Sequence, residues 1–331
     1  MKPNFRPHKK PFDRSAAGRG PARGVPRTPP SLGTPAREAR PAAPGTTHWD
    51  NVADWYDRLV GDEGSEYHQR VVLPGVLRML GMETHNAKRT TQNEAAQAAG
   101  ATSLRILDLA CGQGVLCRQL ARHGHQVVGV DAAAGLIEAA RSRETTERLG
   151  ITYAVADATK LGGEEGSGAG DHASALLPGS FDAVTIVLAI QNITPLSPVW
   201  QGCRALLKPG GSLIVVMMHP CFRVPRGSDW YWEDATRTQS RVVKQYLTSS
   251  KVEIEMQPGA AAAGKGSVKT LTFHRPLQAY INTLGNAGLL LDHIKEWASH
   301  KQSQAGPKQA ELDRALKEIP LFLALRARKT T

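Results

Sequence analysis

The residues that could do chemistry gather in one stretch, Leu104 to Ala133, which reads LRILDLACGQGVLCRQLARHGHQVVGVDAA. Asp108 lies near the end of one apolar segment, two glycines follow, and Asp131 ends a second apolar segment 19 residues after Gly112. Glycine lets a backbone approach a ligand where a Cβ would collide. A carboxylate offers two acceptor oxygens, which suits the paired hydroxyl groups of a ribose. The spacing therefore predicts a cradle for a nucleotide-like cofactor.

Two common cradles do not fit this stretch. Dinucleotide sites favour GxGxxG, and with Gly112 and Gly114 aligned the third position is Cys117. A phosphate-binding GxxxxGK[ST] loop needs a lysine after the glycines, and none follows here. Both departures weaken a nicotinamide or phosphate interpretation.

Alternating apolar and amphipathic segments must position these residues. Strands are expected at 104–110, 126–131, 151–157, 181–190 and 211–219, with helices at 114–124, 133–143 and 198–208 between them. This alternation predicts a parallel sheet with helices on both faces, whose ligand lies at the carboxyl ends of the strands. Later segments predict a hairpin from 251–258 and 267–275, a helix at 276–289, and two final strands at 290–300 and 318–329.

The stretch ILDLACGQG resembles the first motif of the class I S-adenosylmethionine-dependent methyltransferases, commonly VLDLGCGTG, with Ala110 in place of the first glycine. VADAT after the third strand and LKPGG before the fifth support the resemblance, which covers roughly residues 48–331. More narrowly, HPCFRVPR, FHRPL and EIPLFLALRARK look like a bacterial type 11/25-like group of unassigned substrate.

This resemblance implies an α/β fold with a seven-stranded, doubly wound, Rossmann-like sheet. The sheet would be mostly parallel with an antiparallel C-terminal strand, a helical N-terminal lid and a β-hairpin insert after strand five. It also implies S-adenosyl-L-methionine as cofactor, held by Asp108, Ala110, Gly112, Gly114, Asp131, Ala132, Asp157, Ala158, Leu188 and Ala189.

The acceptor side leaves a weaker trace, because methyl transfer mainly needs an in-line approach and exclusion of water. His219, after the fifth strand, is the preferred general base or acceptor-orienting residue, with hydrogen bonding to its own loop as the competing interpretation. Further substrate candidates are Tyr56, His68, Gln191, Trp230, Trp232 and His274. Trp49 and Trp55 are expected in the core. A nucleophilic Cys221 is disfavoured, and no NPPY-like motif of amine methyltransferases is present.

Charge separates the chain into two parts. Residues 1–46 contain ten Lys/Arg, two acids and ten of the 21 prolines, so we expect a disordered basic arm. Residues 47–331 are nearly neutral and would form the methyltransferase domain, divided into a lid (47–83), a polar linker (84–103), a low-complexity loop (162–180) and an insert (220–275).

These observations predict a cytoplasmic methyltransferase acting on a small-molecule acceptor by direct displacement. One alternative is an RNA methyltransferase that the basic arm recruits, since nucleic acid is a conceivable partner of that arm only. Another is a non-catalytic S-adenosylmethionine-binding scaffold. No metal site is expected, because the four cysteines form no CxxC pair, and no apolar run is long enough to span a membrane. The acceptor, the methylated atom and the oligomeric state stay open.

Overall fold

The computed structural model describes residues 49, 53–82, 103–161, 175–255 and 269–330. The predicted arm lies outside these residues, as do nearly all of the polar linker and most of the predicted loop 162–180. Within the described part of the chain, no helix is both long and apolar enough to cross a membrane. The cytoplasmic location stays a prediction.

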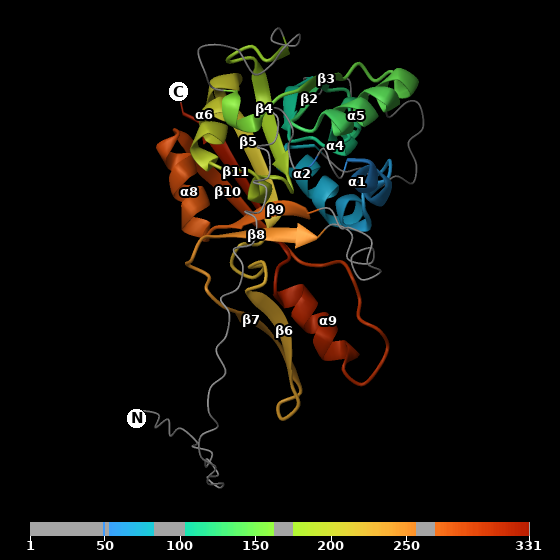
Figure 1. The fold of residues 1–331 in the computed structure, drawn as a ribbon, viewed down its shortest axis with the longest axis vertical. Coiled ribbons are helices and arrows are strands. Elements are labelled where there is room, and N and C mark those ends of the chain that lie inside the picture. Colours follow the sequence, from blue (N-terminus) through green and yellow to red (C-terminus); the bar gives the residue numbers. More distant parts are fainter. Residues whose placement is uncertain (1–48, 50–52, 83–102, 162–174, 256–268, 331) are drawn as a thin grey trace, which may run out of the picture. The chain divides into compact units, whose positions relative to one another are not determined.

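A seven-stranded sheet forms the centre of the domain (Figure 1). Its strands are β1 Arg105–Leu109, β2 Gln126–Asp131, β3 Thr152–Val155, β4 Phe181–Val187, β5 Leu207–Met218, β10 Leu289–Trp297 and β11 Phe322–Lys329. Their order in space is β10-β11-β5-β4-β1-β2-β3. The pairs from β5 to β3 are parallel, whereas β11 runs antiparallel to both of its neighbours. The predicted fold class is confirmed.

Helices cover both faces of the sheet because successive side chains of a strand point to opposite faces. In β1, Ile106 packs into one core with the lid, α4 and α5, whereas Leu107 packs into the other with α6 and α8. The helices are α1 Ala53–Val60, α2 Leu73–Met79, α4 Val115–Arg122, α5 Ala134–Glu147, α6 Leu196–Leu206, α8 Leu277–Asn286 and α9 Gln309–Glu318. Short turns are the π-helix η2 His68–Val72 and the 3-10 helices η4 Ala158–Lys160 and η6 Ile190–Asn192.

Two hairpins follow β5, where the sequence predicts one. The expected hairpin is present as β8 Ser250–Glu255 paired with β9 Lys269–His274. The additional one pairs β6 Ser228–Glu233 with β7 Thr238–Val243. Helix α9 is a second addition, in the charged segment before β11 for which no helix was predicted.

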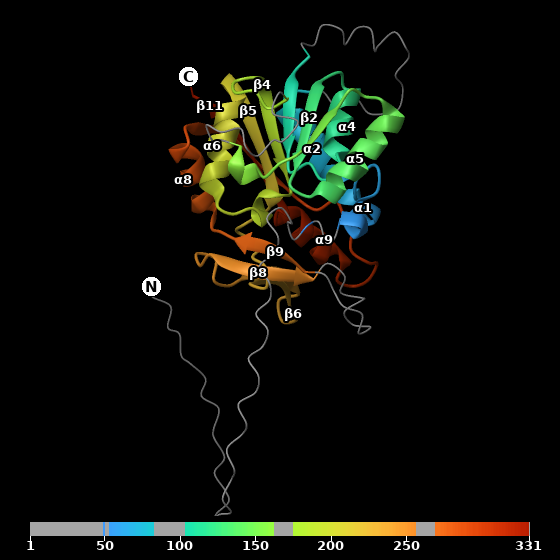
Figure 2. The ribbon, with the colours of Figure 1, turned by 45° about the horizontal axis from the view of Figure 1, so that its top comes forward.

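The chain reverses its direction of strand addition beside β1. Strands β2 and β3 add on one side of β1, and β4 then pairs with its other side. At such a switch point the loops after the two strands diverge and leave a crevice at the carboxyl end of the sheet. Figure 2 shows hairpin β8–β9 lying across this end of the sheet.

Candidate functional site

A cavity of about 380 Å³ opens at the carboxyl ends of β1, β2 and β4. Its walls come from the loops after these strands, from the N-terminal helices and from hairpin β8–β9. The predicted cofactor residues that line it are Asp108, Ala110, Gly112, Asp131, Ala132, Asp157, Ala158, Leu188 and Ala189.

The loop after β1 bends through left-handed backbone conformations. Ala110 and Gly112 have φ angles of 58° and 57°, and the Cys111 N–H donates to the Val130 carbonyl at 3.0 Å. A Cβ on Gly112 would meet no described protein atom closer than the Tyr56 ring at 3.7 Å. The loop therefore presents bare backbone to the cavity.

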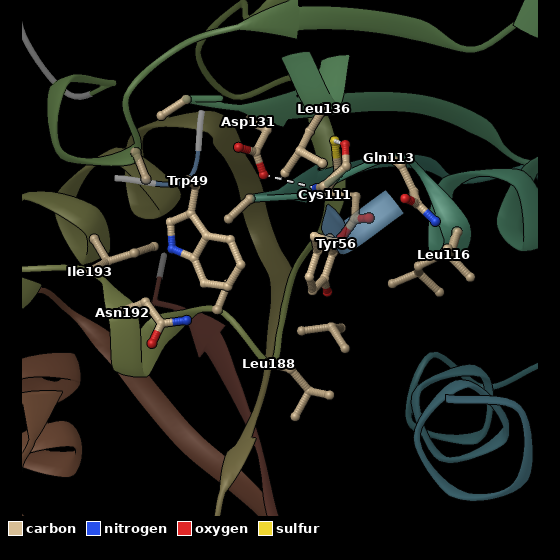
Figure 3. Close-up of a pocket in the computed structure, with 18 of the residues that line it drawn as sticks. Trp49, Tyr56, Cys111, Gln113, Leu116, Asp131, Leu136, Leu188, Asn192 and Ile193 are labelled. Atoms are coloured by element: carbon tan, nitrogen blue, oxygen red, sulfur yellow. Dashed lines mark hydrogen bonds between the residues drawn. The ribbon is translucent and has the colours of Figure 1, made fainter. Parts of the chain in front are cut away.

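Asp131 holds this loop against β2. Its Oδ2 accepts the Gly112 N–H at 2.9 Å, and its Oδ1 accepts the Ala133 N–H at 2.8 Å. A carboxylate oxygen can accept more than one hydrogen bond, so these contacts orient Asp131 without exhausting its capacity. Figure 3 shows Asp131 at the cavity beside the loop that it holds.

Asp108 lies deeper, with 2% of its surface exposed. The Thr185 hydroxyl donates to its Oδ1 at 2.7 Å and the Cys117 thiol donates to its Oδ2 at 3.3 Å. Burial outweighs these bonds and raises the pKa of Asp108 to about 6, with Asp131 adding to the effect. The carboxyl group of Asp108 therefore takes up a proton at a higher pH than an exposed aspartate does.

Gly114 does not line the cavity, although the sequence placed it with Gly112. It precedes α4 with a φ of 81°, and a Cβ there would overlap the Tyr153 hydroxyl and ring. The role of Gly114 is therefore to fit the start of α4 against Tyr153 on β3.

The loops after β3 and β4 complete the inner wall. Asp157 Oδ1 accepts from the backbone N–H and the hydroxyl of Thr159, at 2.9 and 2.8 Å. Leu188 has a φ of 55°, which is uncommon for a branched side chain. Its N–H donates to Val216 and its carbonyl accepts from the Gln191 side chain, both at 2.7 Å. Such strain persists where surrounding bonds enforce it, often at functional sites.

The outer wall is aromatic and apolar. Trp49 and Tyr56 meet edge to face with centroids 5.4 Å apart, and both rings point into the cavity (Figure 3). Leu271 and Phe273 of β9 line the same cavity. Burial, together with the nearby Asp131, raises the pKa of Tyr56 to about 12, so its hydroxyl keeps its proton. Trp49, expected in the core, and the two β9 residues are additions to the predicted site.

Two further polar side chains face the cavity. His68, a predicted substrate contact, has its Nδ1 2.7 Å from the Ser65 hydroxyl, and burial lowers its pKa. Gln113 is 1% exposed and donates its amide to the Gly61 carbonyl at 2.7 Å. The Gln113 Oε1 atom is buried with no hydrogen-bond partner in the described structure. No role for Gln113 is predicted from the sequence.

His219, the preferred general base, does not line this cavity. The ring is 2% exposed, and its Nδ1 accepts the Cys221 N–H at 3.2 Å. The Nε2 atom lies 2.7 Å from Glu296 Oε1, and because Nδ1 accepts, Nε2 must donate there. Burial lowers the pKa of His219 despite Glu296, so the geometry matches the competing interpretation of a loop-bound histidine.

Four other substrate candidates also lie outside the cavity wall. Gln191 turns back to the Leu188 carbonyl, and His274 points away from Phe273 to bond the Tyr246 carbonyl at 2.7 Å. Trp230 packs between arginines, and Trp232 lies under Lys308, 4.3 Å from its ring centroid. The tryptophans pack the insert.

The chain is similar in sequence to known methyltransferases. Residues 107–215 match a family described as "Methyltransferase domain". A ubiquinone biosynthesis O-methyltransferase of Xanthomonas campestris pv. campestris (strain B100) is 33% identical over 111 residues, which are 34% of this chain and 41% of that protein. The chain thus spans about two fifths of the length of the curated relatives that it matches.

Solved structures extend the likeness to most of the domain. An S-adenosylmethionine dependent methyltransferase from Mesorhizobium loti superposes with a TM-score of 0.50 at 27% identity, covering 71% of this chain and 96% of that one. The PH0226 protein from Pyrococcus horikoshii OT3 shares the fold, with a TM-score of 0.50 at 18% identity over 84% of this chain and 99% of that one. These similarities, in sequence over residues 107–215 and in structure over most of the chain, support a class I S-adenosylmethionine-dependent methyltransferase.

Proposed function

We propose that the protein transfers a methyl group from S-adenosylmethionine to a small-molecule acceptor by direct in-line displacement, releasing S-adenosylhomocysteine. The observation that carries this proposal is the Asp131 carboxylate, held by the Gly112 and Ala133 N–H groups in the wall of a lidded cavity. In this orientation both oxygens can accept the two ribose hydroxyl groups of the cofactor.

The remaining inner wall supplies groups that suit the other parts of the cofactor. Asp157 accepts from Thr159 through Oδ1, and its Oδ2 lies 3.8 Å from the Lys160 ammonium. We propose that this Oδ2 and the Ala158 N–H would hold the adenine edge, with Leu188 and Ala189 beside the ring. The unpartnered Gln113 Oε1 suits the ammonium group of the methionine part, and Asp108 lines the same cavity. A buried acceptor without a donor costs about 1–3 kcal/mol, which a cofactor ammonium would recover.

The bound cofactor supplies an electrophilic methyl group, so the protein mainly positions the acceptor and excludes water. His68 is the side chain that we propose to contact the acceptor. Its lowered pKa keeps the imidazole neutral near pH 7, and the bond to Ser65 orients the ring. Tyr56 and Cys111 retain their protons, with pKa values raised to about 12 and about 11 by burial, so neither is a base at this pH.

A small acceptor fits the enclosing wall better than a polymer does. Trp49, Tyr56, Leu271 and Phe273 cover the cavity from the lid and from hairpin β8–β9. Pockets for small ligands are typically concave and mostly apolar, with few polar groups. The O-methyltransferases of ubiquinone biosynthesis to which the chain is similar give further support.

Calorimetric titration of S-adenosylmethionine tests this proposal. We expect the wild type to bind and Asp131→Asn to bind roughly tenfold to a hundredfold more weakly, because a hydrogen bond to a charged group contributes about 1.5–3 kcal/mol. Asp182→Asn is the matched control, since Asp182 also accepts a backbone N–H, from Arg105 at 2.8 Å, but lies outside the cavity.

NAD, titrated in parallel, should give no heat. The proposed site would be contradicted if the folded wild type does not bind S-adenosylmethionine. It would also be contradicted if Asp131→Asn binds S-adenosylmethionine as tightly as Asp182→Asn does.

A further inference from the structure

Two arginines lie against one tryptophan in the insert that follows β5. The guanidinium carbon of Arg223 is 5.4 Å from the Trp230 ring centroid, and that of Arg241 is 5.2 Å from it. Trp230 is on β6 and Arg241 pairs with it across the hairpin from β7. Arg223 lies in the turn after β5, where its N–H donates to the His219 carbonyl at 2.8 Å.

Arg241 has protein partners that fix it in place. Its Nε donates to the Phe222 carbonyl at 2.9 Å, and its Nη2 donates to the Ser228 hydroxyl at 2.8 Å. The first bond fastens hairpin β6–β7 to the turn after β5, and the second lies within the hairpin. Arg241 is therefore a rigid cationic wall next to Trp230.

Arg223 lacks comparable partners. Its Nε is buried with no hydrogen-bond acceptor in the described part of the chain, and no carboxylate there lies within ion-pair distance of it. By contrast, Arg118, Arg122, Arg143 and Arg326 each pair with an aspartate or glutamate. A buried charged donor without an acceptor is costly, and a second guanidinium close by adds like-charge repulsion.

Both groups nevertheless stay charged near neutral pH. Burial and the neighbouring Arg241 lower the pKa of Arg223 to about 10, and burial also lowers the pKa of Arg241. The charge of Asp229 raises the pKa of Arg241 and is not among the causes of the shift of the Arg223 pKa. The Asp229 Oδ1 accepts the Trp230 N–H at 2.7 Å. The turn and the hairpin thus hold two cations for which one carboxylate compensates in part.

We propose that Arg223, Arg241 and Trp230 form a binding site for an oxyanion, the carboxylate or phosphate group of a small molecule. The planar fork of a guanidinium matches two oxygens of either group, which is why arginine serves where such groups are recognised. None of the three residues lines the proposed cofactor cavity. The inference therefore goes beyond methyl transfer and does not depend on it.

Titration of the full chain with inorganic phosphate, and separately with acetate, tests the site. Ionic strength is held constant with chloride, and the Arg223 Nε–H resonance is followed by ¹⁵N NMR after assignment with Arg223→Gln. We expect a saturable shift of this resonance with at least one of the two anions. The anion that shifts the resonance identifies the kind of oxyanion.

The variants distinguish binding at a specific site from nonspecific attraction of the anion by positive charge. Measured by calorimetry, Arg223→Gln should weaken binding of the responding anion by about tenfold or more, and Arg223→Lys should weaken it less because the charge remains without the fork. Arg122→Gln removes the same charge from an arginine already paired with Glu147 at 2.6 Å, and should bind the anion as the wild type does.

The proposal is overturned if neither anion shifts the resonance saturably, or if Arg122→Gln loses as much affinity as Arg223→Gln. Because the titration contains no S-adenosylmethionine and no methyl acceptor, a negative result leaves the proposed function untouched. A failure of S-adenosylmethionine binding would equally leave the oxyanion site standing.

Discussion

Gly112 and Gly114 stand two residues apart in the loop after β1, and both have positive φ angles, of 57° and 81°. Their surroundings differ. Gly112 faces the cavity with no described protein atom closer than 3.7 Å to its absent Cβ, whereas Gly114 faces the Tyr153 ring in close contact. One glycine leaves space for a ligand, and the other leaves space for a side chain of the same protein.

Alanine at Gly114 should therefore mainly reduce stability, whereas alanine at Gly112 should mainly weaken cofactor binding. Gly114→Ala should lower the free energy of unfolding by about 2–4 kcal/mol, because left-handed strain and overpacking against Tyr153 add. Gly112→Ala should cost about 1 kcal/mol of stability but weaken S-adenosylmethionine binding roughly tenfold or more, since its Cβ occupies the cavity. Chemical denaturation and calorimetry of both variants measure this. A Gly112→Ala variant with wild-type affinity would contradict the assigned approach of the cofactor.

The elements that close the cavity come from opposite ends of the chain. Helix α1 contributes Tyr56, and hairpin β8–β9 contributes Leu271 and Phe273. Gln113 in the loop after β1 and Arg118 on α4 donate to the Gly61 and Asp62 carbonyls just after α1. Hairpin β6–β7 contributes no residue to this wall. Hairpin β8–β9 therefore lines the cavity, whereas hairpin β6–β7 does not.

Cofactor binding should distinguish these elements in hydrogen exchange. We expect S-adenosylhomocysteine to slow amide exchange in α1, in the loop 110–114 and in β8–β9, because a ligand stabilises the closed state of the elements that contact it. Hairpin β6–β7 serves as the internal control and should exchange at an unchanged rate. Equal protection of both hairpins, or protection of neither lid element, would argue against this assignment of the walls.

At the scale of the whole molecule, the raised pKa of Asp108 makes the free energy of unfolding depend on pH. The pKa of its buried carboxyl group is raised to about 6, whereas an unfolded aspartate has a pKa of about 3.9. Between these values the folded protein holds a proton that the unfolded chain has released. Stability must then fall as the pH rises through this window, which is the reverse of the usual behaviour of a paired aspartate.

Asp108→Asn should remove this dependence. Without cofactor, the free energy of unfolding of the variant relative to wild type should rise by about 2–3 kcal/mol between pH 4 and pH 6.5. Asp182 provides the contrast, because the Lys208 ammonium and the Arg105 N–H lower its pKa, so Asp182→Asn should give a nearly flat difference over the same range. Urea denaturation across this range measures both. A flat difference for Asp108→Asn would show that Asp108 titrates normally in the folded protein.

The sequence by itself determined the central sheet and the inner wall of the site. Buried parallel strands are short apolar runs, and the residues that end them share one edge of the sheet, so Asp108 and Asp131 could be placed together from sequence spacing, whereas Asp157 comes from the family resemblance. Hairpin β8–β9 was predictable for a similar local reason, since its two strands alternate apolar and polar residues on either side of a glycine-rich segment.

Only the tertiary structure decided which side chains face the cavity. The sequence favours His219 over His68 as the general base, but η2 presents His68 to the cavity, whereas His219 is bound by Glu296, 77 residues away. Gly114 could not be separated from Gly112 until Tyr153 was packed against it. Trp49, Leu271 and Phe273 likewise join the wall through contacts between distant segments. Local periodicity specifies elements, whereas the direction of a single side chain depends on partners that the fold alone brings near.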